Sequence, residues 1–392
     1  MATNPTDYED AKFAPLDQQE DEQDIILGDS IHRYDAAISS SDWTTETVVS
    51  QLTKGNIFLD PDFQRRDAWN RVRKSQYIES LILGIPTPQI ILAERKTRRG
   101  SYIVIDGKQR LLSLRQFAAR DDDSEFRPFA LSGLKLRTDL NGLSYANLTQ
   151  SLFGDSAPDF ENATIRTVVI RAWPTEDFLY EVFLRINSGS VQLSPQELRQ
   201  ALHPGPFTTF LNRFVIESKS IKSMLGLKQP DFRMRDNEIA LRYLAFKHFM
   251  HLYNGNLKYI LDETTRMFNS GWNEICAEVV ESLGAMERAI NVTQEVFGRN
   301  AFKRWNTVYY ETRINRAVFD IMAYYFSQPD IANAALMLRS RVEDAYKAVS
   351  KDYRFSTSVS GTTKSLESVH YRFSLWAAAL EQAIEIPVVS PI

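Results

Sequence analysis

Asp106, Gly107, Gln109 and Arg110 have the side chains and the spacing of a turn that can bind phosphate. Residues 102–105 are β-branched or aromatic and predict a short strand, whereas the apolar residues at positions 111, 112, 114 and 117 have helical spacing. The first backbone N–H groups of a helix lack intrahelical acceptors, and an arginine beside them can pair with an oxyanion. Gly107 would let such a ligand approach the backbone. This strand-to-helix junction is therefore the best candidate in the chain for an anion or phosphate site.

The same junction also allows a purely structural interpretation. Asp106 could cap the helix, Gly107 could permit a tight turn, and Arg110 could be an ordinary surface cation. The spacing alone leaves both interpretations open.

Basic residues gather around this junction. Residues 61–120 contain thirteen Lys or Arg residues and five Asp or Glu residues, although the whole chain has a formal net charge of -4. A negatively charged chain does not bind nucleic acid by bulk charge, so any contact with DNA requires a local basic surface. The residues that we expect to form it are Arg66, Arg71, Arg73, Lys74, Arg98 and Arg99. An ordinary solvated surface is the alternative.

The totals of the chain limit its class. Its 392 residues, 43% of them hydrophobic, are enough for one large domain or two ordinary ones with a real core. Cys276 is the only cysteine, which excludes a disulfide framework and a cysteine-based zinc site. No signal peptide or membrane span is visible, so we expect a cytoplasmic protein that does not enter a membrane.

Several elements should position the junction. Residues 1–23 are acidic and polar and predict a disordered leader. We expect helices near residues 44–54, 70–83 and 176–186, strands at 57–59, 129–131 and 164–172, and a hairpin from residues 89–93 and 102–105. From about residue 207 onward we find helical periodicity and no convincing strand, with helices expected near 238–253, 257–268, 272–296, 308–326, 331–350 and 364–384.

Two shorter patterns are also informative. Ser194, Pro195 and Glu197 have the spacing of a capping box and predict the start of a helix. His248 and His251 lie three residues apart in a helical stretch, but no acid or thiol stands beside them at metal-ligand spacing, so we expect no metal there.

Four ordered blocks give the junction a wider context. They are a Phe-Gln-Arg-Arg-Asp-Ala-Trp stretch at residues 63–69, residues 79–86, the Ile-Asp-Gly-Lys-Gln-Arg-Leu core at 105–111, and residues 183–189 followed by 193–199. In this order the blocks resemble the domain of unknown function 262 family, the amino-terminal domain of GmrSD-type modification-dependent restriction enzymes. The resemblance spans roughly residues 42–202. It implies an α+β fold, with a ParB/sulfiredoxin-like core and a small mixed sheet over residues 24–205, followed by an all-α domain over residues 206–392.

The resemblance implies a role for the Asp-Gly-x-Gln-Arg core, and our mechanistic hypothesis adds neighbouring residues to it. The Asp-Gly-x-Gln-Arg core is expected to bind and hydrolyse a nucleoside triphosphate, with Asp106, Gln109, Arg110 and Glu79 as catalytic residues. Asp106 would hold Mg²⁺ or orient water, and Glu79 would act as a base or as a second metal ligand. The expected nucleotide contacts are Gly107, Lys108, Arg110, Arg65, Asn187 and Arg185. Glu197 could help to close the pocket, although the capping box already explains it.

Lys108 departs from the family pattern, which usually has Gln at this position, and Ser190 stands where Gly is usual. A lysine would add a positive charge beside a phosphate and would remove an amide that can position water. Hydrolysis is therefore less firmly expected than binding.

The leading hypothesis is a bacterial defence protein that binds and hydrolyses a nucleoside triphosphate and engages DNA, restricting phage or modified DNA. One alternative is a non-catalytic DNA-binding or protein-interaction module, and another is an endonuclease that itself nicks DNA. Residues 207–392 contain no histidine-centred nuclease motif, which favours a nuclease partner subunit. The sequence leaves a homo-oligomer open.

Overall fold

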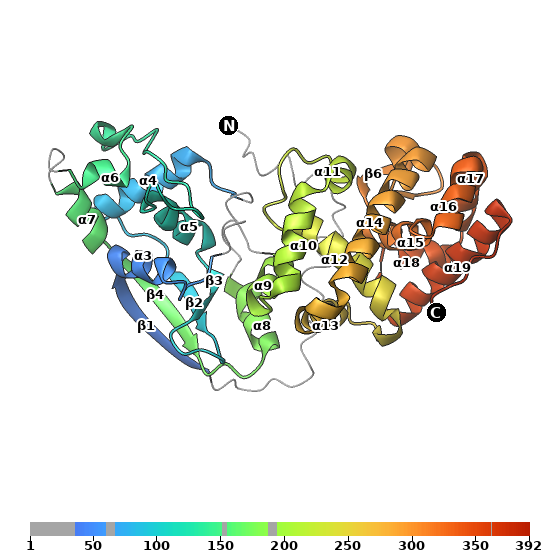
Figure 1. The fold of residues 1–392 in the computed structure, drawn as a ribbon, viewed down its shortest axis with the longest axis horizontal. Coiled ribbons are helices and arrows are strands. Elements are labelled where there is room, and N and C mark those ends of the chain that lie inside the picture. Colours follow the sequence, from blue (N-terminus) through green and yellow to red (C-terminus); the bar gives the residue numbers. More distant parts are fainter. Residues whose placement is uncertain (1–35, 60–66, 151–154, 187–193, 362) are drawn as a thin grey trace. The chain divides into compact units, whose positions relative to one another are not determined.

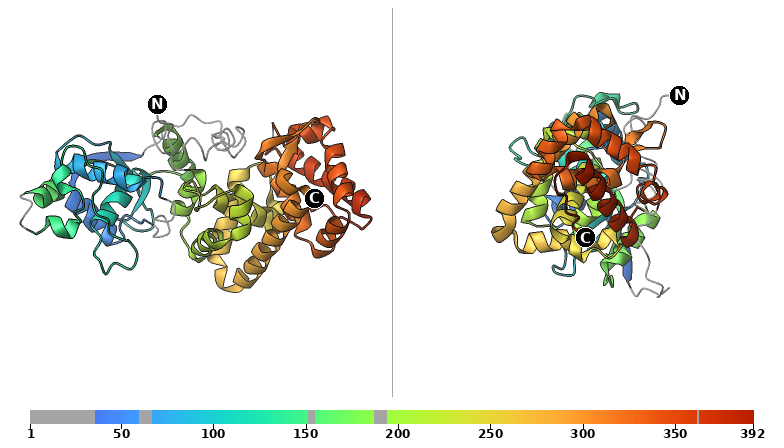
Figure 2. Two further views of the ribbon diagram at one scale, coloured as in Figure 1. Left: turned by 90° about the horizontal axis from the view of Figure 1, so that it is seen from above. Right: turned by 90° about the vertical axis from the view of Figure 1, so that its right-hand side faces the viewer.

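The computed structural model describes residues 36–59, 67–150, 155–186, 194–361 and 363–392 (Figure 1). The chain divides into two compact units, whose described parts are residues 36–202 and 203–392. Strands and helices are combined in the first unit, coloured blue to green, whereas the second, coloured green to red, consists mainly of helices (Figure 2). The predicted α+β class is confirmed. None of the described helices is long and apolar enough to cross a membrane.

A four-stranded mixed sheet organises the N-terminal unit. Its strands are β1 (Ala37–Thr44), β2 (Ile90–Glu94), β3 (Tyr102–Asp106) and β4 (Thr164–Arg171), in the order β1-β4-β2-β3. Strand β4 pairs antiparallel with β1 and parallel with β2, and β2 pairs antiparallel with β3. The predicted hairpin is therefore confirmed.

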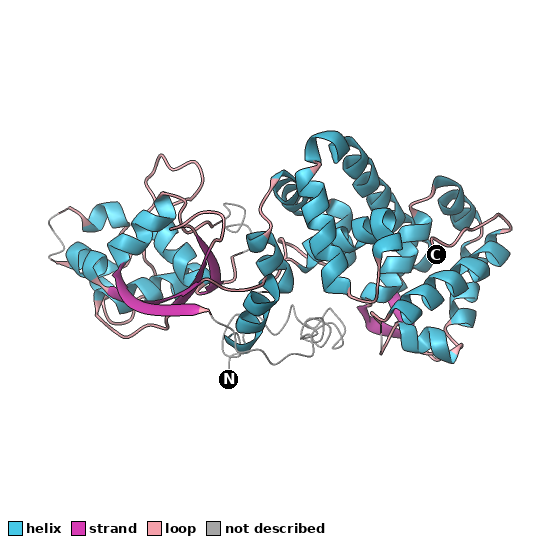
Figure 3. Ribbon diagram, turned by 90° about the horizontal axis from the view of Figure 1, so that it is seen from below, coloured by secondary structure: helices cyan, strands magenta, loops and turns pink. Residues whose placement is uncertain are grey.

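The helices of this unit pack beside the sheet (Figure 3). Helices α3 (Thr45–Thr53) and α4 (Arg71–Ile82) each contact α5 (Lys108–Phe117) and α7 (Ser156–Asn162), and α8 (Glu176–Ile186) and α9 (Pro195–Leu202) contact β3. Two short elements, η3 (Thr138–Leu140) and α6 (Tyr145–Leu148), complete the described part. Leu111, Leu112, Leu114 and Phe117 of α5 are fully buried. The helix that begins at the candidate turn is thus fixed in the core.

Two predicted strands in this unit are wrong. Residues 129–131 form a loop, in which the backbone of Leu131 exchanges hydrogen bonds with Gly142 and Leu143. Of residues 57–59, only Ile57 makes a bridge, to Tyr102. Ile57, Leu59 and Leu131 are buried in loop backbone whereas Phe58 is exposed, so apolar character alone did not indicate a strand.

The C-terminal unit is built on a long helix, α14 (Trp272–Phe297). The other helices are α10 (Pro206–Glu217), α11 (Lys219–Leu225), α12 (Arg235–Phe249), η5 (Met250–Leu252), α13 (Leu257–Ser270), η6 (Gly298–Asn300), α15 (Arg316–Phe326), α16 (Pro329–Met337), α17 (Arg339–Val349), α18 (Tyr353–Ser358) and α19 (Leu366–Ile384). The predicted all-α character needs one correction, because β5 (Lys303–Trp305) and β6 (Tyr310–Ile314) form an antiparallel pair.

Aromatic packing accounts for this strand pair. Trp305 and Tyr310 face each other across the two strands with ring centroids 4.9 Å apart. The helix predicted from residue 308 begins instead at Arg316, where the Asn315 side chain accepts a hydrogen bond from the Val318 N–H. The single helix predicted over residues 331–350 is also wrong, since α16 and α17 are separated at Leu338.

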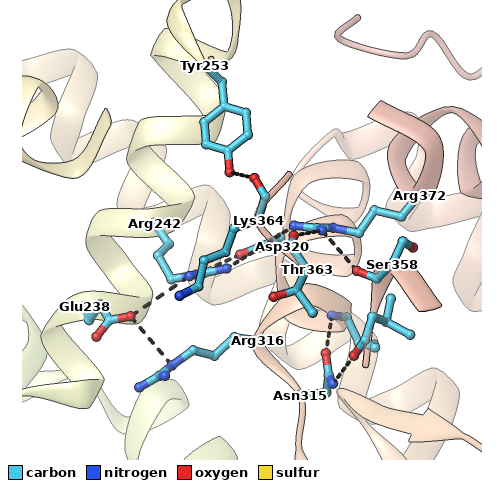
Figure 4. A network of polar contacts seen from close by, with 12 residues as sticks. Glu238, Arg242, Tyr253, Asn315, Arg316, Asp320, Ser358, Thr363, Lys364 and Arg372 are labelled. Carbon is cyan, nitrogen blue, oxygen red and sulfur yellow. Dashed lines mark hydrogen bonds and ion pairs between the residues drawn. The ribbon is translucent and has the colours of Figure 1, made fainter. Parts of the chain in front are cut away.

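A buried ionic network joins three helices of this unit (Figure 4). Asp320 of α15 accepts hydrogen bonds from Arg242 of α12 at 2.6 and 3.1 Å and from Arg372 of α19 at 3.1 Å. Glu238 lies 4.0 Å from Arg242 and 3.6 Å from Arg316. All five side chains are at most 8% exposed, so the network specifies how α12, α15 and α19 pack.

Candidate functional site

The candidate turn has a geometry that only glycine adopts readily. Gly107 follows the last residue of β3 and has a φ of 99°, in the left-handed region. A Cβ at this position would lie 3.1 Å from Cγ1 of Ile90 and 3.2 Å from Nη2 of Arg110. Both the backbone conformation and the close approach of the guanidinium group therefore require glycine.

Arg110 is the central charge of the site. Arg110 is 8% exposed, and its Nη2 donates a hydrogen bond of 2.7 Å to Oδ2 of Asp106. Its Nε is buried and has no hydrogen-bond partner among the described residues. The side-chain carbonyl oxygen of the neighbouring Gln109 is likewise buried and has no partner in the described part of the chain. Buried polar atoms are nearly always paired, so these two atoms lack the partner that such groups normally have.

The start of α5 adds its own electrostatic preference. No side chain caps this end of the helix, because glycine is the N-cap residue. The N-terminus of a helix carries a partial positive charge, and a buried arginine beside it increases the positive potential. The Asp106 carboxylate balances Arg110, with the side chain of Asp106 25% exposed and that of Arg110 9% exposed. Chemically, this arrangement can bind an oxyanion through one guanidinium group and the backbone of the first helical turn.

The ammonium group of Lys108 pairs with a carboxylate of α9. This ammonium group forms an ion pair with Oε1 of Glu197, and the two side chains are 5% and 4% exposed. The second oxygen of Glu197 accepts a hydrogen bond of 2.7 Å from the Ser194 N–H, and Ser194 Oγ accepts one of 3.1 Å from the Glu197 N–H. The predicted capping box is confirmed. Glu197 therefore stabilises α9 and neutralises Lys108 at once.

Glu79 also has a structural task. Its Oε1 accepts hydrogen bonds from the N–H groups of Leu136 at 2.9 Å and Arg137 at 2.7 Å. These contacts tie α4 to the loop before η3. The catalytic role expected for Glu79 stays a prediction.

Tyr77 is a neighbour of the site that the sequence did not single out. It lies on the buried face of α4, with the charge of Arg110 and the hydroxyl of Thr87 close to its own hydroxyl. Burial raises the pKa of Tyr77, and the positive charge of Arg110 opposes that rise. The sequence signal for this neighbour was a tyrosine, which carries a polar hydroxyl, among the aliphatic residues on the inward face of the helix.

The residues expected to contact DNA fall into two groups. Arg98 and Arg99 are exposed on the turn between β2 and β3. The others that the structure describes lie near the start of α4, where Arg71 and Arg73 are exposed as well but also contact the protein itself. Arg71 Nε donates to the Ala130 carbonyl at 2.7 Å, and the Arg73 guanidinium lies 4.8 Å from the centre of the Trp69 ring.

Lys74, the third of these residues, is held inside the unit. Its ammonium group pairs with Asp67 and donates a hydrogen bond of 2.6 Å to Gln116, and burial lowers the pKa of Lys74 to about 8. Arg185, expected at the nucleotide, is exposed and pairs with Glu181. Arg65, Arg66 and Asn187 lie outside the described residues.

Asp106 is the one carboxylate at this turn that we expect to hold Mg²⁺. No group of three or more His, Cys, Asp or Glu side chains within the described ranges could hold a metal ion. Magnesium usually keeps several waters and binds through one or two carboxylates together with phosphate oxygens. The donor set at the turn fits Mg²⁺ only in that form, as an ion that enters with a phosphate ligand.

Comparison with known proteins identifies the region that contains this site. Residues 46–204 match the family model described as the GmrSD restriction endonuclease, N-terminal domain. The matched segment contains the whole described turn, α4, α5 and the capping box of α9. No curated protein and no solved structure matches the chain. The similarity of the core to ParB and sulfiredoxin stays a prediction.

Proposed function

Residues 46–204 form a GmrSD-type restriction endonuclease N-terminal domain, and we propose that this domain binds the phosphates of a nucleoside triphosphate at the start of α5. The proposal includes hydrolysis of the nucleotide and engagement of DNA, in defence against phage or modified DNA. One observation carries it. Arg110 is more than nine-tenths buried beside an uncapped helix N-terminus, and its Nε has no hydrogen-bond partner among the described residues.

Each residue of the turn has a task in this proposal. Gly107 allows a phosphate to approach the backbone, and Arg110 neutralises its charge. Gln109 accepts a hydrogen bond from the ligand or from water. Asp106 would hold Mg²⁺, which supplies charge neutralisation for the phosphates when bound. Arg98 and Arg99 are exposed and contribute the positive charge that contacts the DNA backbone.

Equilibrium titration of the full chain with ATP, GTP, CTP and UTP tests the binding step. We expect at least one nucleotide to bind, and we expect Arg110→Ala to weaken its affinity by roughly tenfold or more, because a hydrogen bond to a charged group contributes about 1.5–3 kcal/mol. Arg120→Ala is the matched control, since Arg120 is an exposed arginine just after α5. Equal affinity in wild type and Arg110→Ala would contradict the proposal.

Release of inorganic phosphate, measured with and without DNA, tests hydrolysis separately. Binding without release in wild type would favour the second candidate, a non-catalytic module in which the turn holds a phosphate of DNA. The exposed Arg98 and Arg99 support DNA contact in either case. Affinity for DNA should fall steeply with salt, and Arg98→Ala/Arg99→Ala should reduce the slope of that dependence by about 1 to 2.

Cleavage by the chain itself is a third candidate, supported by the restriction endonuclease family to which residues 46–204 belong. Supercoiled plasmid incubated with the purified chain and Mg²⁺ or Mn²⁺ tests it, on modified and unmodified DNA. Nicked product would support cleavage by this chain. Unchanged plasmid would instead favour a partner subunit as the nuclease.

A further inference from the structure

The carboxylate of Asp106 lies where a ligand oxyanion would be expected. Arg110 donates from Nη2 to Oδ2 of Asp106 at 2.7 Å, while its buried Nε has no partner in the described part of the chain. A guanidinium group usually binds a carboxylate or phosphate through two parallel N–H donors. The pair in the structure thus uses the Nη2 donor of that fork and leaves the Nε donor without a partner among the described residues.

The two partners differ in how freely they can move. The Asp106 side chain is 25% exposed, whereas the Arg110 side chain is 9% exposed. The Arg110 guanidinium also packs closely on Gly107, where a Cβ would lie 3.2 and 3.3 Å from its Nη2 and Nε. The carboxylate is therefore the partner with more access to solvent.

A cation at the N-terminus of a helix is unfavourable unless an anion balances it. Asp106 is the anion that does so in the structure, through its pair with Arg110. A phosphate that bound to the same guanidinium group would make this carboxylate redundant and would also repel it. One of the two anions must then leave the guanidinium group. The Asp106 side chain is the one already partly exposed to solvent.

We propose that Asp106 is an internal competitor of the phosphate ligand, which occupies Arg110 in the free protein and is displaced when phosphate binds. This inference rests on the proposed function of the turn. Its consequence is that the negative charge of Asp106 opposes binding of a phosphate in the absence of metal. Once displaced, the carboxylate faces solvent and is available to Mg²⁺.

Binding of inorganic triphosphate to the full chain tests this exchange directly, in EDTA and then in Mg²⁺. In EDTA, Asp106→Asn should bind triphosphate roughly tenfold more tightly than wild type, because the charge-assisted pair that the ligand must break is gone. In Mg²⁺, wild type should gain affinity and Asp106→Asn should gain little. Asp106→Ser, which also lacks the charge, should behave as Asp106→Asn does.

Asp123→Asn is the matched control. Asp123 pairs with Arg115 of the same helix at 2.6 Å, with side chains 15% and 10% exposed, but at the far end of α5. We expect the affinity of the Asp123→Asn variant for triphosphate to stay within about twofold of wild type, because the charge of Asp123 does not compete for Arg110. Equal tightening in Asp123→Asn would mean a general charge effect and would overturn the competition.

The outcomes separate this inference from the proposed function. If wild type binds triphosphate and Asp106→Asn binds it equally or more weakly in EDTA, the competitor role is overturned while phosphate binding stands. If neither wild type nor Asp106→Asn binds triphosphate in either condition, the proposed function and the inference fail together. Tighter binding by both Asp106 variants, with an unchanged Asp123→Asn, supports the inference.

Discussion

The ion pair between Lys108 and Glu197 should contribute strongly to the stability of the N-terminal unit. The two side chains are 5% and 4% exposed, so the pair is held away from water. Removal of one partner of a buried ion pair costs about 3–5 kcal/mol, because the remaining charge stays buried without compensation. Glu197→Gln keeps an oxygen for the Ser194 N–H and so preserves the cap of α9. We therefore expect Glu197→Gln to lower the free energy of unfolding by about 3 kcal/mol.

Lys108→Met should have an effect of similar size, since it leaves the Glu197 carboxylate buried without the ammonium group, although the Ser194 N–H still donates to it. The double variant Lys108→Met/Glu197→Gln buries neither charge. Its loss in free energy of unfolding should therefore be smaller, by about 2 kcal/mol or more, than the sum of the losses in the two single variants, as expected for residues in direct contact. Urea denaturation of the full chain at pH 7 measures all three.

Arg185→Gln is the control for this cycle. Arg185 pairs with Glu181 on the surface of α8, where its side chain is 74% exposed. Exposed ion pairs contribute about 0–1 kcal/mol, so this variant should unfold close to wild type. The reasoning would be refuted if Glu197→Gln were as stable as Arg185→Gln, or if the effects of the two single variants simply added in the double variant.

Three further predictions concern other buried groups. Burial lowers the pKa of His248, so the unfolded chain binds a proton more readily than the folded one, and stability should fall as the pH drops below about 6.5; His248→Gln should reduce this loss in acid denaturation, whereas the exposed His251→Gln should not. Asp320→Asn should lower the free energy of unfolding by about 3–5 kcal/mol, measured in urea, because Arg242 and Arg372 both lose their shared carboxylate. Gly107→Ala should weaken triphosphate binding measured by titration, because its Cβ would lie 3.2 Å from Nη2 of Arg110 and would shift the guanidinium group, and it should cost about 1–3 kcal/mol of stability from the left-handed backbone.

Local signals explain which parts of the fold could be predicted. The hairpin of β2 and β3, helix α4 and the capping box of α9 are each specified by residues close together in the sequence. Strand β1 is different, because its sequence Ala-Ile-Ser-Ser-Ser-Asp-Trp-Thr is polar and most of its residues are exposed. It is a strand because β4, 120 or more residues later, pairs with it along its whole length. No nearby residue indicates that partner.

The same distinction applies to the site. The strand, the glycine turn and the helix at residues 102–117 could be predicted from their own sequence, and the structure has them at these positions. The partner of Lys108 could not, because Glu197 lies 89 residues away and its position depends on how α9 packs against β3. The sequence explained Glu197 through its cap alone. Burial of both charges, which no local pattern encodes, gives it the second role.

The pairing of charges at the turn also changes how the departure at Lys108 is understood. A lysine next to a phosphate-binding turn suggests added positive charge, but Glu197 already balances this one. Arg110 is balanced as well, by the carboxylate of Asp106. This carboxylate is more exposed than that of Glu197, and it accepts a hydrogen bond from Nη2 of Arg110. A buried ion pair resists separation, whereas a partly exposed one can be exchanged for another anion. The two cations of the turn therefore differ, because Lys108 links the start of α5 to α9 and Arg110 is the cation that we propose binds the phosphate.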